Sequence, residues 1–112
     1  MTDHAANRAL IAPLRAAMYV GTGVRNALAD VLADDAVVHM CAPFGDITGA
    51  AYFDTVFAPL VAAMPDVERR DWIVMAGADD HDADWVGCGG HYVGTFAAPF
   101  LGIVPTQRLA HM

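Results

Sequence analysis

The chain has 112 residues, of which 56% are hydrophobic and 17% are charged, and its formal net charge is −7. This composition excludes a disordered chain, because ample apolar surface is available for a core. Six residues are Lys or Arg against 13 Asp and Glu, so no basic face exists to bind nucleic acid or an anionic membrane. We therefore expect residues 1–112 to form a single domain whose partners are neither nucleic acid nor membrane.

The compartment follows from the ends of the chain and its cysteines. No stretch approaches the roughly 20 apolar residues that span a bilayer. The N-terminus opens on Asp3 and His4 rather than on the basic segment of a signal peptide, which favours the cytoplasm. Cys41 and Cys88 are two cysteines far apart in sequence, and we expect free thiols rather than a disulfide framework.

The first third of the chain predicts two helical segments. Residues 3–18 place Leu10, Leu14 and Met18 on one helical face, and Pro13 should kink this helix or start its second half. Gly21-Thr22-Gly23 is a break. A second helix is expected over residues 24–32, where apolar residues recur every three to four positions.

A strand and a long helix follow. Residues 36–41 alternate as a strand, with Val37, His39 and Cys41 on one face. Pro43, Gly45 and Gly49 predict a loop. Residues 50–64 carry a wide apolar stripe that predicts the longest helix, with a kink at Pro59 inside it.

The last third predicts an antiparallel sheet. Two strands are expected over residues 67–76 and 83–97, joined by an exposed acidic tip at residues 77–82. Four glycines inside the second strand indicate a sharp bend, a bulge or a close approach, and hence a strongly curved sheet: Gly87, Gly89, Gly90 and Gly94. Residues 106–112 could begin another strand. Helices followed by a run of strands predict an α+β fold.

Several segments together resemble one family. Residues 35–39 are similar to the first strand of that family, and residues 45–49 to the glycine loop before its long helix. Residues 62–67 are similar to the end of that helix and the start of the second strand. The third strand and the loop after it are matched by residues 85–87, 94–96 and 100–106. In this order and spacing the chain resembles the SnoaL-like polyketide cyclases and predicted ester cyclases, within the cone-shaped NTF2-like superfamily. The resemblance implies N-terminal helices packed on a curved antiparallel sheet.

The family's chemistry and its usual length give further expectations. The resemblance implies cyclisation by intramolecular aldol closure, in which a base removes a proton next to a carbonyl, with no metal and no cofactor. In the family, two more strands and an acid/base aspartate normally follow the segment that matches residues 109–112, and this aspartate has no counterpart here. An unfinished sheet edge would invite a second copy of the chain, so we expect a homodimer.

The candidate catalytic residues are His39, His91 and Asp46. A base for this reaction should titrate near the working pH, as histidine does. His39 stands on an apolar strand, and His91 lies in the glycine-rich strand on the same face as Trp85 and Thr95. Asp46 follows Gly45 in the predicted loop. Each also has a structural interpretation: a core or solvent-facing histidine for His39, cross-strand packing for His91 and a turn for Asp46. His111 is a weaker candidate, close to the end of the chain.

An apolar small molecule is the expected partner. The expected lining is aromatic: Phe44, Tyr52, Phe53, Phe57, Trp72, Trp85, Tyr92 and Phe96. No metal is expected, because the histidines show no His-x-x-x-His pair and the acidic tip matches no calcium loop. The chain has no lysine and no serine, which excludes a P-loop and a Gly-x-Ser-x-Gly nucleophile.

Three functions fit these observations. The first is a cofactor-free cyclase or isomerase of an apolar carbonyl compound, which requires His39 or His91 beside a second polar group in a pocket. The second is a non-catalytic binding domain, with a pocket but no paired acid and base. The third is a dimerising scaffold whose interior is filled by side chains. Fold alone does not choose among them.

Overall fold

The computed structural model describes residues 3–112, and its chain begins with two short helices in line. α1 (His4–Leu10) is capped by Asp3, whose side chain accepts a 3.0 Å hydrogen bond from the N–H of Ala6. α2 (Ala12–Val20) follows after Ile11 and has Pro13 in its first turn. A proline there removes an N–H that has no helical partner anyway. The prediction that Pro13 starts the second half of this segment is confirmed.

The predicted glycine break separates α2 from α3 (Val24–Val31). Gly21 and Gly23 have φ angles of 77° and 73°, in the left-handed region that residues with a Cβ rarely adopt. Their sharp turn places α3 at an angle to α2, so that Val24 and Leu28 are buried.

A small hairpin replaces part of the predicted loop. β1 (Val37–His39) pairs antiparallel with β2 (Asp46–Thr48), in the register Val38 to Ile47. The prediction of a loop through residues 43–49 was therefore wrong at Asp46–Thr48. Three residues are too few to show an alternating pattern, and only the burial of Ile47 reveals the strand's inner face.

The long helix is built of three pieces in one continuous run. α4 (Gly49–Tyr52) leads into a π-helical turn, η1 (Phe53–Phe57), and then into α5 (Ala58–Ala63). The N–H of Ala58 donates to the carbonyl of Phe53, five residues back. Pro59 lacks an N–H and its ring crowds the carbonyl four residues earlier, so the wider turn before it accommodates the ring. The irregularity expected at Pro59 is thus this π turn.

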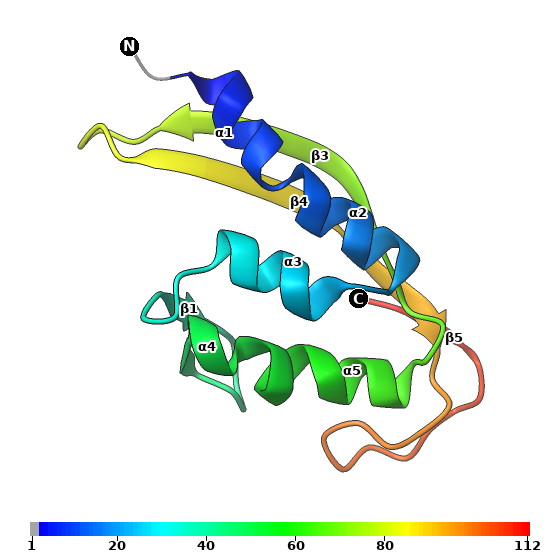
Figure 1. The fold of residues 1–112 in the computed structure, drawn as a ribbon. Helices are drawn as coiled ribbons and strands as arrows, with labels where there is room; N and C mark the ends of the chain where they lie inside the picture. The colour runs from blue at the N-terminus through cyan, green and yellow to red at the C-terminus, as the bar shows by residue number, and fades with distance from the viewer. Residues whose placement is uncertain (1–2) are drawn as a thin grey trace.

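The predicted sheet is present, in the order β3-β4-β5 and antiparallel throughout. β3 (Glu68–Ala78) and β4 (Asp84–Thr95) form a long hairpin around the acidic tip, and β5 (Leu109–His111) pairs with the end of β4. Figure 1 shows the hairpin curving along α1 and α2 before it bends toward α3 and α5. The expected curved sheet and the expected C-terminal strand are both confirmed.

A bulge in β3 decides which side chains face the helices. Asp71 pairs with Gly90 and Ile73 with Gly89, so Trp72 is an extra residue. Before the bulge the inward side chains are Arg69 and Asp71; after it they are Val74 and Ala76. Trp72 and Ile73 therefore both point outward, with 68% and 41% of their surface exposed.

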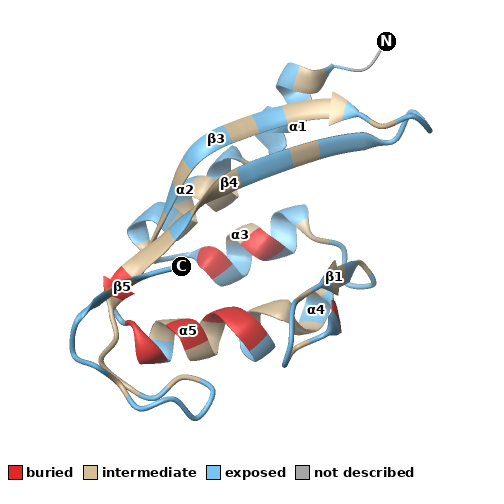
Figure 2. Ribbon diagram, turned by 180° about the vertical axis from the view of Figure 1, so that it is seen from behind, coloured by how far each residue is buried: buried red, intermediate tan, exposed pale blue. Residues whose placement is uncertain are grey.

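The core lies where α3, η1 and α5 meet the bend of the sheet, and Figure 2 shows the buried residues gathered there. The buried hydrophobic residues are Val24, Leu28, Ile47, Val56, Phe57, Leu60, Ala63, Met64 and Val67. The half of the hairpin farther from the core has no buried residue and many exposed ones (Figure 2). Among residues 3–112, no helix is long and apolar enough to cross a membrane.

Candidate functional site

A bridge of two arginines on one aspartate joins α2 to β3. Asp71 accepts hydrogen bonds from Nε of Arg15 at 2.7 Å, on Oδ2, and from Nε of Arg69 at 2.8 Å, on Oδ1. The exposed fraction is 5% for the Asp71 side chain, 19% for Arg69 and 40% for Arg15. Burial alone would raise the pKa of Asp71, but the two arginines outweigh it and hold that pKa below its ordinary value. Asp71 is therefore a carboxylate at neutral pH.

Two tyrosines continue this polar group into the core. The guanidinium carbon of Arg69 lies 5.0 Å from the centre of the Tyr92 ring, a cation–π contact. Tyr92 packs edge-on against Phe57, with ring centres 6.3 Å apart, and Tyr52 lies in the same cluster. Burial, with the neighbouring Tyr92, raises the pKa of Tyr52 to about 12. The Tyr52 hydroxyl therefore stays protonated at neutral pH.

A cavity of about 300 Å³ lies beside this bridge, between the first two helices and the sheet. Most of its walls are apolar, and its charged groups are the bridged Arg15, Asp71 and Arg69. It is lined by Ile11, Leu14, Arg15 and Met18 from the helical side and by Arg69, Asp71, Val86, Cys88 and Tyr92 from the sheet. We call it the α2–sheet cavity. Few polar groups in an apolar wall are typical of a small-molecule site.

A second, wider hollow shares the same ionic groups. It measures about 600 Å³ and runs between α2 and the start of β3, and we call it the α2–β3 groove. It is lined by Ala12, Arg15, Ala16, Tyr19, Arg69, Arg70 and Asp71. The bridge of Arg15, Asp71 and Arg69 therefore belongs to both hollows.

Two of the predicted catalytic residues meet, but on the surface. Nδ1 of His39 lies 2.7 Å from Oδ1 of Asp46, because β1 and β2 place these residues directly opposite each other. Their side chains are 76% and 68% exposed. Neither residue lines the α2–sheet cavity or the α2–β3 groove.

The third predicted catalytic residue, His91, lies on the outer side of β4. Its ring centre is 6.1 Å from Trp72 and 5.8 Å from His111. Trp85 shares this outer side and is 64% exposed, whereas Tyr92 faces the helices. The sequence pattern had placed His91 with Trp85 on one face and Tyr92 on the other, as observed.

The remaining aromatic candidates divide between separate places. Tyr52, Phe53 and Phe57 pack in the cluster of Val24 and Leu28. Phe96 packs in another cluster with Leu60 and Met64, and Phe44 is half-buried in the turn between β1 and β2. Only Tyr92 of the eight predicted ligand-binding residues lines the α2–sheet cavity.

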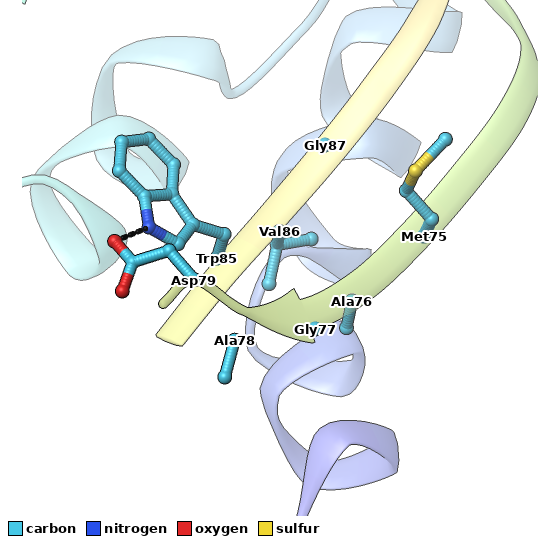
Figure 3. Close-up of a pocket in the computed structure, with 8 residues that line it drawn as sticks. All are labelled: Met75, Ala76, Gly77, Ala78, Asp79, Trp85, Val86 and Gly87. Carbon is cyan, nitrogen blue, oxygen red and sulfur yellow. Dashed lines mark hydrogen bonds between the residues drawn. The ribbon is translucent and has the colours of Figure 1, made fainter. Parts of the chain in front are cut away.

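The acidic tip has a structural explanation. Asp79 accepts hydrogen bonds from the backbone of His81 and Ala83 and from Nε1 of Trp85, the last at 2.8 Å. Figure 3 shows this contact at the rim of a shallow apolar hollow of about 400 Å³, with Gly87 and Met75 on the neighbouring strands. Over residues 3–112, no three His, Cys, Asp or Glu side chains converge to hold a metal ion.

Comparison with known proteins rests on structure alone. No family model matches the sequence, and no curated protein matches it. The fold matches the crystal structure of IdmH, "a putative polyketide cyclase" from Streptomyces antibioticus, with a TM-score of 0.68 and 23% identity. The match covers 92% of this chain and 74% of that chain. The chain has the NTF2-like cone fold. The predicted α+β cone is thereby confirmed, and at this identity the match concerns the fold.

Within this cone, the sequence interpretation missed Arg15, Arg69 and Asp71. Two signals were present. Arg15 falls between Leu14 and Met18 on the apolar side of its helix, and Arg69 and Asp71 alternate on a strand in step with the buried Val67. Charged residues at inward positions of predicted elements indicate a buried ion pair or a site.

Proposed function

We propose that the chain binds an apolar carbonyl compound in the α2–sheet cavity and promotes its cyclisation or isomerisation without a cofactor. Support comes from the cavity itself, whose apolar walls carry Tyr92 and Arg69 on one side. Further support comes from the fold, which is shared with a protein described as "a putative polyketide cyclase". The single observation that carries the proposal is the Arg69 guanidinium held 5.0 Å over Tyr92 at the cavity wall.

Such a reaction needs hydrogen-bond donors that stabilise the negative oxygen of an enolate. Removing a proton next to a carbonyl leaves an enolate, and fixed hydrogen-bond donors lower the barrier by stabilising its oxygen. Tyr92 and Arg69 supply an O–H and N–H groups at the wall. Tyr52, in the same cluster as Tyr92, is proposed as a positioning residue, because a pKa of about 12 keeps its hydroxyl protonated.

The described wall of the cavity offers no strong base to accept the proton. Both oxygens of Asp71 already accept hydrogen bonds from arginines, and its lowered pKa makes it a poor base. Among residues 3–112, no histidine lines this cavity. The His39–Asp46 pair has the arrangement of a general base but lines neither hollow, so we propose it as the alternative acceptor only for a ligand that reaches the surface of β1 and β2.

Binding without turnover is the second candidate function, and the absence of a histidine from the described cavity wall favours it. One experiment separates the two. The probe is 2-acetylnaphthalene, an apolar aryl ketone whose binding is measured by calorimetry and whose α-proton exchange in heavy water is followed by NMR. The cyclase proposal expects binding and accelerated exchange. Tyr92→Phe should slow the exchange by about 100-fold while changing the dissociation constant little.

Each outcome of this experiment has a meaning. Binding with no acceleration supports the non-catalytic candidate and contradicts the cyclase. No detectable binding contradicts both. Loss of exchange in Tyr92→Phe counts only with an unchanged melting temperature, because Tyr92 also packs against Phe57.

We also propose that the outer side of the hairpin packs on a second copy of the chain. This outer face carries exposed apolar side chains from both strands: Trp72, Ile73, Met75 and Trp85. Gly87 and Gly89 lie on the same side of β4, and the Trp72 ring and Ile73 pack over Gly89. A continuous exposed apolar face of this kind can pair with itself about a twofold axis.

A further inference from the structure

Half of the chain's cationic side chains meet at the α2–β3 groove. The chain has six Lys and Arg residues, and Arg15, Arg69 and Arg70 line this one hollow. Arg70 leans toward α2, with its guanidinium carbon 5.4 Å from the Tyr19 ring centre, and is paired with Glu68 at 2.6 Å. In a chain of net charge −7, this concentration of positive charge is where an anion would be attracted.

The charges inside the groove do not balance. Glu68 neutralises Arg70, but Asp71 must serve both Arg15 and Arg69. Each of these two arginines uses its Nε on Asp71. The Nη nitrogens of Arg15 make no hydrogen bond to residues 3–112, and those of Arg69 lie beside Tyr92. Two guanidiniums on one carboxylate leave one uncompensated positive charge at a partly buried place.

The chemistry of an added ligand follows from that charge. A guanidinium presents a planar set of N–H groups that matches the two oxygens of a carboxylate. One uncompensated charge suits a monoanion, whereas a phosphate with up to two charges would leave a negative excess. Partial burial strengthens the attraction relative to bulk water.

We propose that the α2–β3 groove is a carboxylate subsite, and that the ligand of this chain is an apolar carboxylic acid. The apolar body occupies the α2–sheet cavity, and the carboxylate binds the terminal nitrogens of Arg15 and Arg69, which both hollows share. The inference rests on the proposed function, because it uses the same cavity and adds a substrate class to it.

The test compares two probes of the same shape. Naphthalene-2-carboxylate and naphthalene-2-carboxamide differ in charge, and calorimetry gives the dissociation constant of each. We expect the carboxylate to bind about 10-fold tighter, a preference that falls as salt is raised. Arg15→Gln and Arg69→Gln should each remove most of this preference. Arg108→Gln is the matched control, because Arg108 is exposed just before β5 and lines neither hollow.

A change of opposite sign excludes a merely structural role. Asp71→Asn removes the anion that competes for the two arginines, so the carboxylate should bind several-fold tighter while the carboxamide changes little. A structural role for Asp71 predicts weaker binding of both probes. If Asp71→Asn fails to fold, Arg15→Lys decides instead, because it keeps the charge at the more exposed arginine and should retain part of the preference.

The outcomes separate this inference from the proposed function. Equal binding of both probes overturns the carboxylate subsite and leaves the α2–sheet cavity as a binding site. Binding of neither probe overturns both. A carboxylate preference that survives Arg15→Gln and Arg69→Gln but disappears in Arg108→Gln overturns the placement of the subsite.

Discussion

Gly90 lies so close to the backbone of Arg70 that a Cβ atom on it would overlap the Arg70 carbonyl oxygen and stand 2.8 Å from Cα of Asp71. This contact is at the β3 bulge, where Asp71 pairs with Gly90. The bulge turns Asp71 toward the helices and Trp72 away from them. A bare backbone at Gly90 is therefore a condition for placing Asp71 in the candidate site.

Gly90→Ala should destabilise the fold by about 2 kcal/mol, because the added methyl group meets backbone that cannot move aside without opening the bulge. Gly87→Ala is the control on the same strand, since its Cβ would find Met75 Cγ at an ordinary 3.7 Å. We expect that variant within about 0.5 kcal/mol of the wild type. Urea unfolding measures both. Equal losses of stability in the two variants would mean that the close backbone contact at Gly90 does not cause the destabilisation.

The bulge also shows how far the sequence could predict the fold. Glycines in β4 indicated a bend, a bulge or a close approach of another group to the backbone. The close approach is observed at Gly90, next to the backbone of Arg70. The extra residue, however, is Trp72 on the partner strand. A sequence pattern describes one strand at a time, and the register between strands is a long-range property. The kink expected at Pro59 takes the form of a π turn, which the sequence did not specify, and β2 is too short at three residues to show a pattern.

The candidate site was less predictable than the fold. Arg15 and Asp71 are 56 positions apart, and nothing in either local pattern says that they meet. Histidine was sought because its ordinary pKa suits acid and base work, and His39 did meet Asp46, but in a hairpin at the surface. The charged residues that line the cavity, Arg15 on the predicted helix and Arg69 and Asp71 on the predicted strand, were not singled out as candidates.

Asp66 connects the end of α5 to β4 and should make stability depend on acid pH. Its carboxylate accepts hydrogen bonds from the N–H of Thr95 at 2.7 Å and from the Thr95 hydroxyl at 2.8 Å. Both bonds hold the pKa of Asp66 below its ordinary value, and the bond from the Thr95 backbone N–H contributes most. The folded state therefore binds this proton less readily than the unfolded chain, so the stabilisation is complete above about pH 4 and is lost as the pH falls below it.

Asp66→Asn tests that dependence. The difference in unfolding free energy between wild type and variant should be largest near neutral pH and should shrink as the pH falls below about 4. Asp30→Asn is the control, because the exposed Asp30 makes no side-chain hydrogen bond to residues 3–112. A wild-type–variant difference that stays constant from neutral to acid pH would contradict the assignment.

Tyr52 should govern stability at the alkaline end. Burial raises its pKa to about 12, above the ordinary value of 10.0. The unfolded chain loses this proton first as pH rises, so folding loses stability between about pH 10 and 12. Tyr52→Phe should flatten this decline, as followed by urea unfolding across that range. An equally steep decline of stability in the variant would mean that a group other than Tyr52 causes it.

The outer face of the hairpin should control association of two copies. Trp72→Ala should raise the dissociation constant of the dimer by at least about 10-fold, because a large aromatic ring near the centre of an interface carries much of its energy. Sedimentation equilibrium measures this constant. Val104→Ala is the control, since Val104 is 78% exposed on the loop before β5. A monomeric wild type at the highest concentration tested would remove the proposed dimer, and an equal effect of both variants would relocate its interface.

The His39–Asp46 pair can be weighed against the cavity by one substitution. The pair is a contact between two exposed side chains, and even exposed ion pairs contribute only about 0–1 kcal/mol, so His39→Ala should leave the unfolding free energy almost unchanged. If the chemistry occurs at the α2–sheet cavity, α-proton exchange of 2-acetylnaphthalene should also be unaffected. A loss of exchange of about 100-fold without a change in binding would instead identify His39 as the base. In that case the ketone must bind near β1 rather than in the cavity. Phe44→Ala, in the turn next to β1, should then also change the exchange rate.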